Sequence, residues 1–248
     1  MTISSLPLLS LLVLGLALAV APAAQDDVLR ARRSEARLAD LLGADHPAWS
    51  NAYTVAWGSE PYTTEFRALY TDAGLALRFA ATDDAPWHTM TRRDDPIWNE
   101  EVVEIFIDPD GDGRNYAEIE INPVNVVCDL QIFATEPRLD ADISWDFAGL
   151  ETHVAPLLDD EGATVGWLAT ATLPWRGFAS LVDTEVTLPP APGDRWKFNV
   201  FRIKRPGGQA APEQDAMYAP WSPTPGASFH APTAFRDLLF VATESGAP

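Results

Sequence analysis

The chain has 248 residues, and its formal net charge is −19, from 36 acidic and 17 basic residues. This excess of negative charge excludes nucleic acid as a partner, because its phosphates would be repelled, and it permits cations and neutral polar ligands such as sugars. The single cysteine, Cys128, can form no internal disulfide, so the fold depends on the packing of its core. A chain of this length can bury one sizeable core, and we expect one domain.

The first 24 residues have the pattern of a signal peptide. An apolar run from Leu6 to Ala21 is followed by small residues up to Ala24, although no Lys or Arg precedes the run. The run is also shorter than the roughly 20 residues that a membrane-spanning helix needs. We therefore predict cleavage after residue 24, a mature domain over 25–248, secretion or release into the periplasm, and no membrane span in the mature protein.

Strand patterns dominate the chain after its first 45 residues. The segment from Asp26 to Leu42 fits neither the helical nor the strand period, and both remain open there. About ten short strands follow, separated by turns rich in Gly, Pro and Asp; we place them at 52–57, 66–71, 75–81, 102–108, 116–122, 125–133, 152–158, 165–173, 195–204 and 238–242. This pattern predicts an all-β fold, an antiparallel two-sheet β-sandwich of jelly-roll type in a single domain.

The hairpin formed by 102–108 and 116–122 is the most regular part of the sequence. Apolar and polar residues alternate along both strands, which predicts one face toward the core and one away from it. The apolar face carries Val103, Ile105, Ile107, Ala117, Ile119 and Ile121, and the polar face carries Glu104, Glu118, Glu120 and Asn122. We expect the polar face to be open to solvent.

The turn of this hairpin is dense in carboxylates. Asp108, Asp110 and Asp112 offer the oxygen ligands that calcium prefers, and the intervening glycines let carbonyl groups turn inward. The spacing begins like an EF-hand loop, but the position of the bidentate glutamate is occupied by Ile119. We favour a plain hairpin turn and keep a structural calcium ion at these three aspartates as the alternative.

Four blocks of sequence together resemble a known family. They are WNEEVVEIFID, YAEIEINP, RWKFNVFRI and YAPWSPTPGASFHAPTAF, and their order and spacing are similar to those of family 9 carbohydrate-binding modules and the wider DOMON-like group. The resemblance implies a β-sandwich that binds an oligo- or polysaccharide and holds calcium structurally.

The resemblance also implies a set of binding residues. Trp98 and Trp221 match a pair of tryptophans that sandwich a sugar, and Glu104 matches a carboxylate that accepts hydrogen bonds from sugar hydroxyls. Three polar residues in the matching region are further candidates for hydrogen bonds: Asn125, Asn199 and Arg202. The strand period places Asn199 and Arg202 on opposite faces of one strand, so both reach the same ligand only if a bulge intervenes.

Three function classes follow from these observations. We predict an exported, non-catalytic carbohydrate-binding module. A glycoside hydrolase would need Glu104 with Glu118 or Glu120 as its acid and base or nucleophile, and an open hairpin face offers no apolar pocket to raise one pKa. DOMON-like relatives include haem proteins with a Met, His or Lys ligand, for which Met90 and Met217 are available, although neither lies in a matching block.

Overall fold

The computed structural model describes residues 28–182, 186–212 and 215–243, and the predicted signal peptide lies outside them. The described chain is built from strands and short 3-10 helices. None of its helices is long and apolar enough to cross a membrane.

The strands agree closely with those predicted from the alternating pattern. Their bounds are β1 Val28–Arg33, β2 Thr54–Ser59, β3 Tyr62–Tyr70, β4 Gly74–Thr82, β5 Val102–Asp108, β6 Tyr116–Ile121, β7 Val127–Ala134, β8 Asp140–Asp142, β9 Glu151–Leu158, β10 Thr164–Pro174, β11 Arg195–Lys204, β12 Met217–Pro220 and β13 Arg236–Val241. The 3-10 helices are η1 Leu38–Leu42, η2 Pro47–Asn51, η3 Ile97–Asn99, η4 Trp175–Ser180, η5 Gly208–Ala210 and η7 Pro232–Ala234. The segment left open thus contains β1 and η1, while β8 and β12 were not predicted.

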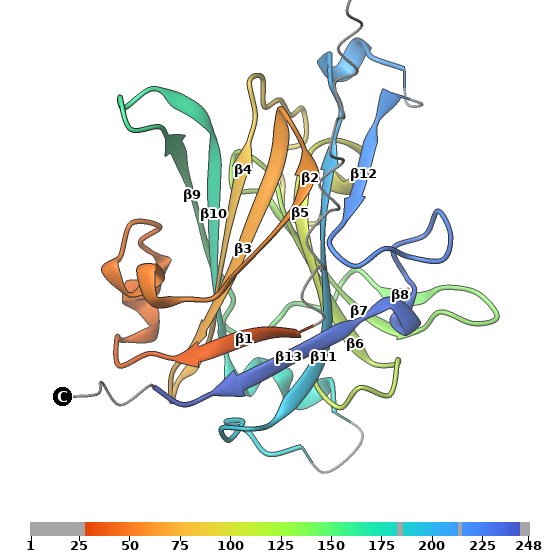
Figure 1. Cartoon of the computed structure of the whole chain (residues 1–248). Helices are drawn as coiled ribbons and strands as arrows, with labels where there is room; N and C mark the ends of the chain where they lie inside the picture. The colour runs from red at the N-terminus through yellow and green to blue at the C-terminus, as the bar shows by residue number, and fades with distance from the viewer. Residues whose placement is uncertain (1–27, 183–185, 213–214, 244–248) are drawn as a thin grey trace, which may run out of the picture.

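Hydrogen bonds link all the described strands into one continuous sheet, which folds into two layers. The order is β8-β7-β6-β5-β11-β13-β1-β3-β4-β10-β9, with β12 beside β11 and β2 beside β3. In Figure 1, β3, β4, β9 and β10 fan out on one side, β5 and β11 lie on the other, and β1 and β13 run side by side across one end. The prediction of an all-β, single-domain sandwich is confirmed. Its purely antiparallel form needs correction, because β1 pairs in parallel with both β13 and β3.

The main core lies between the two layers. The apolar face of the β5–β6 hairpin belongs to it, as predicted, and so do Phe66 and Phe79 from the opposite layer. Burial of these aromatic and β-branched side chains is the dominant favourable contribution to folding, because each removes a large apolar area from water.

The other face of the hairpin is not open, which corrects the prediction from the alternating pattern. Every residue of β5 and of β6 is buried. A second apolar cluster covers this face, with Phe106 and Phe201 at its centre and Trp98, Met90 and Phe229 packed against it from the loops. The polar face of the hairpin is therefore enclosed by loops that the pattern of the strands alone does not reveal.

Candidate functional site

A pocket of about 320 Å³ lies on this enclosed face of the β5–β6–β11 layer. Its lining is formed by Trp98, Asn99, Glu104, Phe106, Glu118, Leu130, Leu139, Ile203, Tyr218, Ala227, Phe229 and His230. The volume is at the low end of the range of about 300 to 1,000 Å³ for small-molecule sites. Aromatic and aliphatic side chains predominate, and the few polar groups are concentrated on two neighbouring strands.

Strand register brings the polar groups of the pocket together. Glu104 on β5 lies directly opposite Glu120 on β6, and Phe106 lies opposite Glu118. On the other side of β5, Glu104 pairs with Phe201 of β11. Side chains at paired positions point to the same face of a sheet, so the register places three carboxyl groups and two phenyl rings on one face of the layer. Glu104, Glu118 and Phe106 of this group line the pocket.

Aromatic rings from the loops form the sides of the pocket. Trp98 is half-buried in η3, while Tyr218 on β12 is 51% exposed. Phe229 stacks on Phe201 with 4.2 Å between ring centroids, and Tyr218 meets Phe229 edge to face at 6.1 Å. The pocket therefore combines a tryptophan and a tyrosine with accessible ring surface and a tightly packed apolar base.

Burial dominates the electrostatics of the three carboxyl groups. Desolvation, with the charge of Glu118 beside it, raises the pKa of Glu104 well above its usual range, and the pKa of Glu120 is raised by desolvation and by both other glutamates. Burial also raises the pKa of Glu118 to about 7. Desolvation lowers the pKa of His230 to about 4, which leaves its imidazole neutral at neutral pH.

Trp221, predicted to stack on a ligand, lies outside the pocket. It is 1% exposed, stacks on Phe198 with 5.1 Å between centroids, and belongs to the core between the two layers. Trp98 packs against the second cluster, on the other face of the layer. The pair of tryptophans predicted to sandwich a ligand is therefore not formed, and Tyr218 is the aromatic residue of the same block that reaches the pocket.

Comparison with known proteins agrees with this geometry. Residues 36–240 match the model of the carbohydrate-binding family 9. The chain belongs to this family.

Solved structures of other proteins share this fold. A putative carbohydrate-binding protein from Bacteroides uniformis is 17% identical, with a TM-score of 0.62 over 86% of this chain and 98% of that one. A family 9 module from Caldicellulosiruptor kristjanssonii in complex with cellotriose is 12% identical, with a TM-score of 0.59 over 89% and 98%. The same module has been solved with glucose.

One similar protein comes from a fungus. An extracellular protein of Arthroderma benhamiae is 28% identical over 188 residues, which are 73% of this chain and 79% of that protein.

The three other residues predicted to bind sugar lie outside the pocket of this family 9 domain. Asn199 is fully buried, and its side chain bonds the backbone of Ser222 through both its amide nitrogen and its oxygen. Arg202 is 2% exposed and donates to Asp83 and to backbone carbonyls. Asn125 is exposed, has a φ of 64°, and donates to the carbonyl of Thr152. Each of the three side chains therefore makes hydrogen bonds within the protein, and none of the three lines the pocket.

The aspartates of the hairpin turn lie close together, but the carboxylate of Asp108 already accepts hydrogen bonds from backbone amides. Asp108 accepts hydrogen bonds from the amides of Gly111 and Gly113, each at 2.8 Å, through different carboxylate oxygens. Oxygens of Asp108, Asp110 and Asp112 lie within 4.8 Å of one another. The contacts of Asp108 agree with the hairpin-turn interpretation, and calcium at these three residues stays a prediction.

The open hairpin face expected from the sequence was the argument against a glycoside hydrolase, and the structure shows these glutamates buried instead. They do lie in a partly apolar pocket, and burial does raise their pKa values. A glycosidase, however, needs one carboxyl group that stays protonated and another that ionises readily, because acid and nucleophile or base have opposite tasks. Here burial raises the pKa of all three groups, to about 7 for Glu118 and well above the usual range for Glu104 and Glu120, and a hydrolase stays an alternative for a turnover assay to test.

Sequence reasoning missed Tyr218, Phe229 and His230 as pocket residues. Tyr218 and Trp221 are three positions apart, so the period of two places them on opposite faces of an extended segment. That spacing is a signal in the sequence that only one of the two rings can face the pocket.

Proposed function

We propose that this protein is an exported, non-catalytic module that binds a saccharide in the pocket between Trp98 and Tyr218. The observation that carries the proposal is that two accessible aromatic rings and the carboxyl group of Glu104 line one pocket. A single sugar unit or a short oligosaccharide suits its volume.

The chemistry of sugars matches these side chains. A pyranose ring has apolar C–H faces, which pack on flat aromatic rings, and a rim of hydroxyl groups, which need polar partners. Glu104 can serve such a hydroxyl in either protonation state, since a carboxylate accepts hydrogen bonds and a protonated carboxyl group both donates and accepts. The cellotriose and glucose complexes of the family 9 module from Caldicellulosiruptor make these two sugars the first ligands to test.

Export is supported by two independent observations. The apolar run near the N-terminus has the pattern of a signal peptide, and the fungal relative is an extracellular protein. Polysaccharides are found outside cells, so an extracellular or periplasmic location agrees with saccharide binding.

Calorimetric titration of the purified mature domain with glucose, cellotriose and a wider glycan panel tests the proposal. Replacing either ring, in Trp98→Ala or Tyr218→Ala, removes a stacking surface of about 1 to 2 kcal/mol, and binding should weaken roughly five- to thirtyfold. Leu158→Ala is the matched control, because Leu158 is 54% exposed on β9, a strand that contributes nothing to the pocket, and this variant should bind like the wild type.

Four results would contradict the proposal. Wild-type protein that binds no glycan of the panel would remove its basis, and unchanged affinity in both ring variants would place the site elsewhere. Turnover of a chromogenic glycoside that Glu104→Gln abolishes would show a hydrolase, and a Soret band in the purified protein would show a haem-binding domain.

A further inference from the structure

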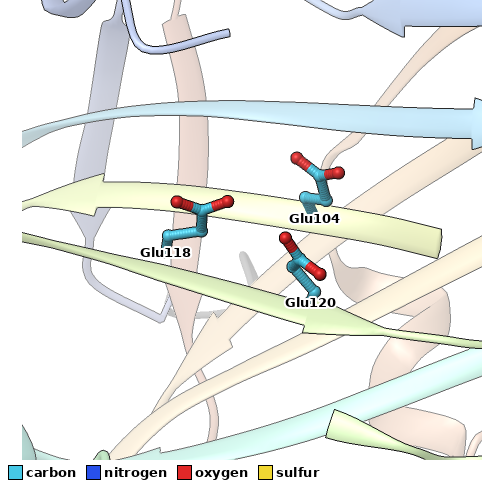
Figure 2. A group of neighbouring side chains, drawn as sticks. All are labelled: Glu104, Glu118 and Glu120. Carbon is cyan, nitrogen blue, oxygen red and sulfur yellow. The ribbon is translucent and has the colours of Figure 1, made fainter. Parts of the chain in front are cut away.

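The three glutamates on the pocket face of the β5–β6 hairpin form a compact cluster of oxygen atoms. Figure 2 shows the side chains of Glu104, Glu118 and Glu120 directed toward one another from β5 and β6. One carboxylate oxygen from each lies within 4.8 Å of the others. The residues are 2%, 6% and 0% exposed, so water hydrates this group of acids poorly.

These buried oxygens are largely without partners in the described part of the chain. Oε1 of Glu104, Oε2 of Glu118 and both oxygens of Glu120 make no hydrogen bond of ordinary geometry there. A buried acceptor with no partner is costly, and an unpaired buried charge is more costly still. Glu120 is the strongest case, because its whole carboxyl group is buried and is approached only by the backbone of Trp98 and by the other acids, without a hydrogen bond of ordinary geometry to either oxygen.

No positive side chain offsets the cluster among the described residues. The base that lies beside the cluster is His230, whose Nε2 is 3.8 Å from Oε2 of Glu118. Among the described residues, no lysine or arginine forms an ion pair with any of the three glutamates, whereas the buried acids Asp83 and Glu101 do have such partners. Protons or a bound cation must therefore neutralise the three acids.

The geometry favours a cation. An ion with bonds of about 2.1 to 2.5 Å to oxygen holds its ligands roughly 3 to 5 Å apart, which is the spacing of these carboxylate oxygens. The ring of His230 is oriented by a contact of 3.0 Å between its Nδ1 and the hydroxyl of Tyr116, as metal-site histidines are oriented by a second partner. Glu104 and Glu118 also line the pocket, which gives an ion access from solvent.

We propose that Glu104, Glu118 and Glu120 bind a divalent cation beside the pocket, separate from the aspartates of the hairpin turn. Three carboxylates are oxygen ligands of the kind that calcium and manganese prefer. The imidazole of His230 lies beside Glu118, where it is positioned to support the same ion. The ion would share Glu104 with the proposed saccharide site, but its binding is testable in the absence of any saccharide.

Titration of chelator-treated protein with calcium chloride and with manganese chloride at pH 7.5 tests this inference. We expect one ion to bind per chain and to raise the melting temperature. Glu120→Gln keeps the shape of the side chain and removes one ligand charge, and it should weaken binding by at least about tenfold, the lower end of what loss of a supporting group costs a metal site. Glu120 is absent from the pocket lining, so this variant leaves the proposed sugar contacts in place.

Asp112→Asn is the matched control, because Asp112 belongs to the other acidic cluster and is exposed. This variant should bind the ion as tightly as the wild type. If Glu120→Gln fails to fold by circular dichroism, Glu118→Gln takes its place, and elemental analysis of the purified wild type should find one equivalent of metal.

Two outcomes would overturn the site. Absence of binding with both ions would mean that protons neutralise the glutamates. Binding lost in Asp112→Asn and kept in the glutamate variants would assign the ion to the hairpin turn.

Discussion

At the scale of single residues, a resemblance between sequences shows which segment of the chain contributes to a site. It is a poorer guide to which side chain of that segment reaches the site. The block around β12 was predicted to supply Trp221, and the structure supplies Tyr218 in its place. The backbone amide of Trp221 donates to the carbonyl of Val200, and its ring fills space beside Phe198 in the main core. A tryptophan at this position suggested a ligand contact, but the alternation of side chains along the extended segment points its ring into the core.

Trp221→Ala should therefore act on stability. Removal of a buried tryptophan leaves a cavity, and we expect the free energy of unfolding to fall by about 3 to 5 kcal/mol. Urea denaturation followed by circular dichroism measures this loss. Trp98→Ala is the comparison, because Trp98 is half-buried and its removal should cost less stability and more saccharide affinity. A Trp221→Ala protein as stable as the wild type would contradict its assignment to the core.

At the scale of elements, local pattern predicted most of the strands and little of what covers them. The β5–β6 hairpin was predicted within one residue because its alternation is a local property of the sequence. Trp98 lies just before β5, but Phe229 comes over the polar face from a loop near the other end of the chain, and no local period encodes the position of either ring. The strands β8 and β12 were not predicted because each is only three or four residues long and is defined by its pairing with β7 or β11.

The 3-10 helix η4 provides a test of close packing at this scale. Gly177 in η4 faces Phe147, and a Cβ atom there would lie 2.1 Å from that ring, which itself packs on Phe178. Overpacking of this kind costs about 1 to 3 kcal/mol, so Gly177→Ala should lower the free energy of unfolding by that amount in urea denaturation.

Gly226→Ala is the control for this substitution. A Cβ atom at Gly226 meets nothing within 4 Å, and its φ is not positive. A surface change of this kind should leave stability within about 0.5 kcal/mol of the wild type. Equal effects of the two alanine variants would contradict the close packing of η4 against Phe147.

At the scale of the whole molecule, a buried ionic network joins segments that are far apart in sequence. Asp83, just after β4, accepts from Arg202 and Lys204 of β11 at 2.7 Å each, and Lys204 also reaches Glu101, just before β5, at 2.8 Å. All four side chains are at most 4% exposed. Arg202 was predicted to bind sugar, and this network explains its position. Nothing in the sequence indicates that these four charged residues are in contact, because only the fold brings them together.

The network predicts a dependence of stability on pH through Glu101. Burial, in competition with Lys204, raises the pKa of Glu101 to about 7 from an ordinary value of 4.5. Between these values the unfolded chain loses a proton that the folded chain keeps, so rising pH favours unfolding over this interval. Wild-type protein should therefore lose stability relative to Glu101→Gln between pH 5 and pH 8, by at most about 1.4 kcal/mol per pH unit.

Urea denaturation of both proteins at the two pH values measures the change, and the ionisable groups around Glu101, which are Asp83, Arg202, Lys204 and Tyr62, are present in both. A stability difference that stays constant with pH, or that shifts in favour of the wild type as pH rises, would mean that Glu101 is ionised in the folded protein and forms a stabilising ion pair with Lys204.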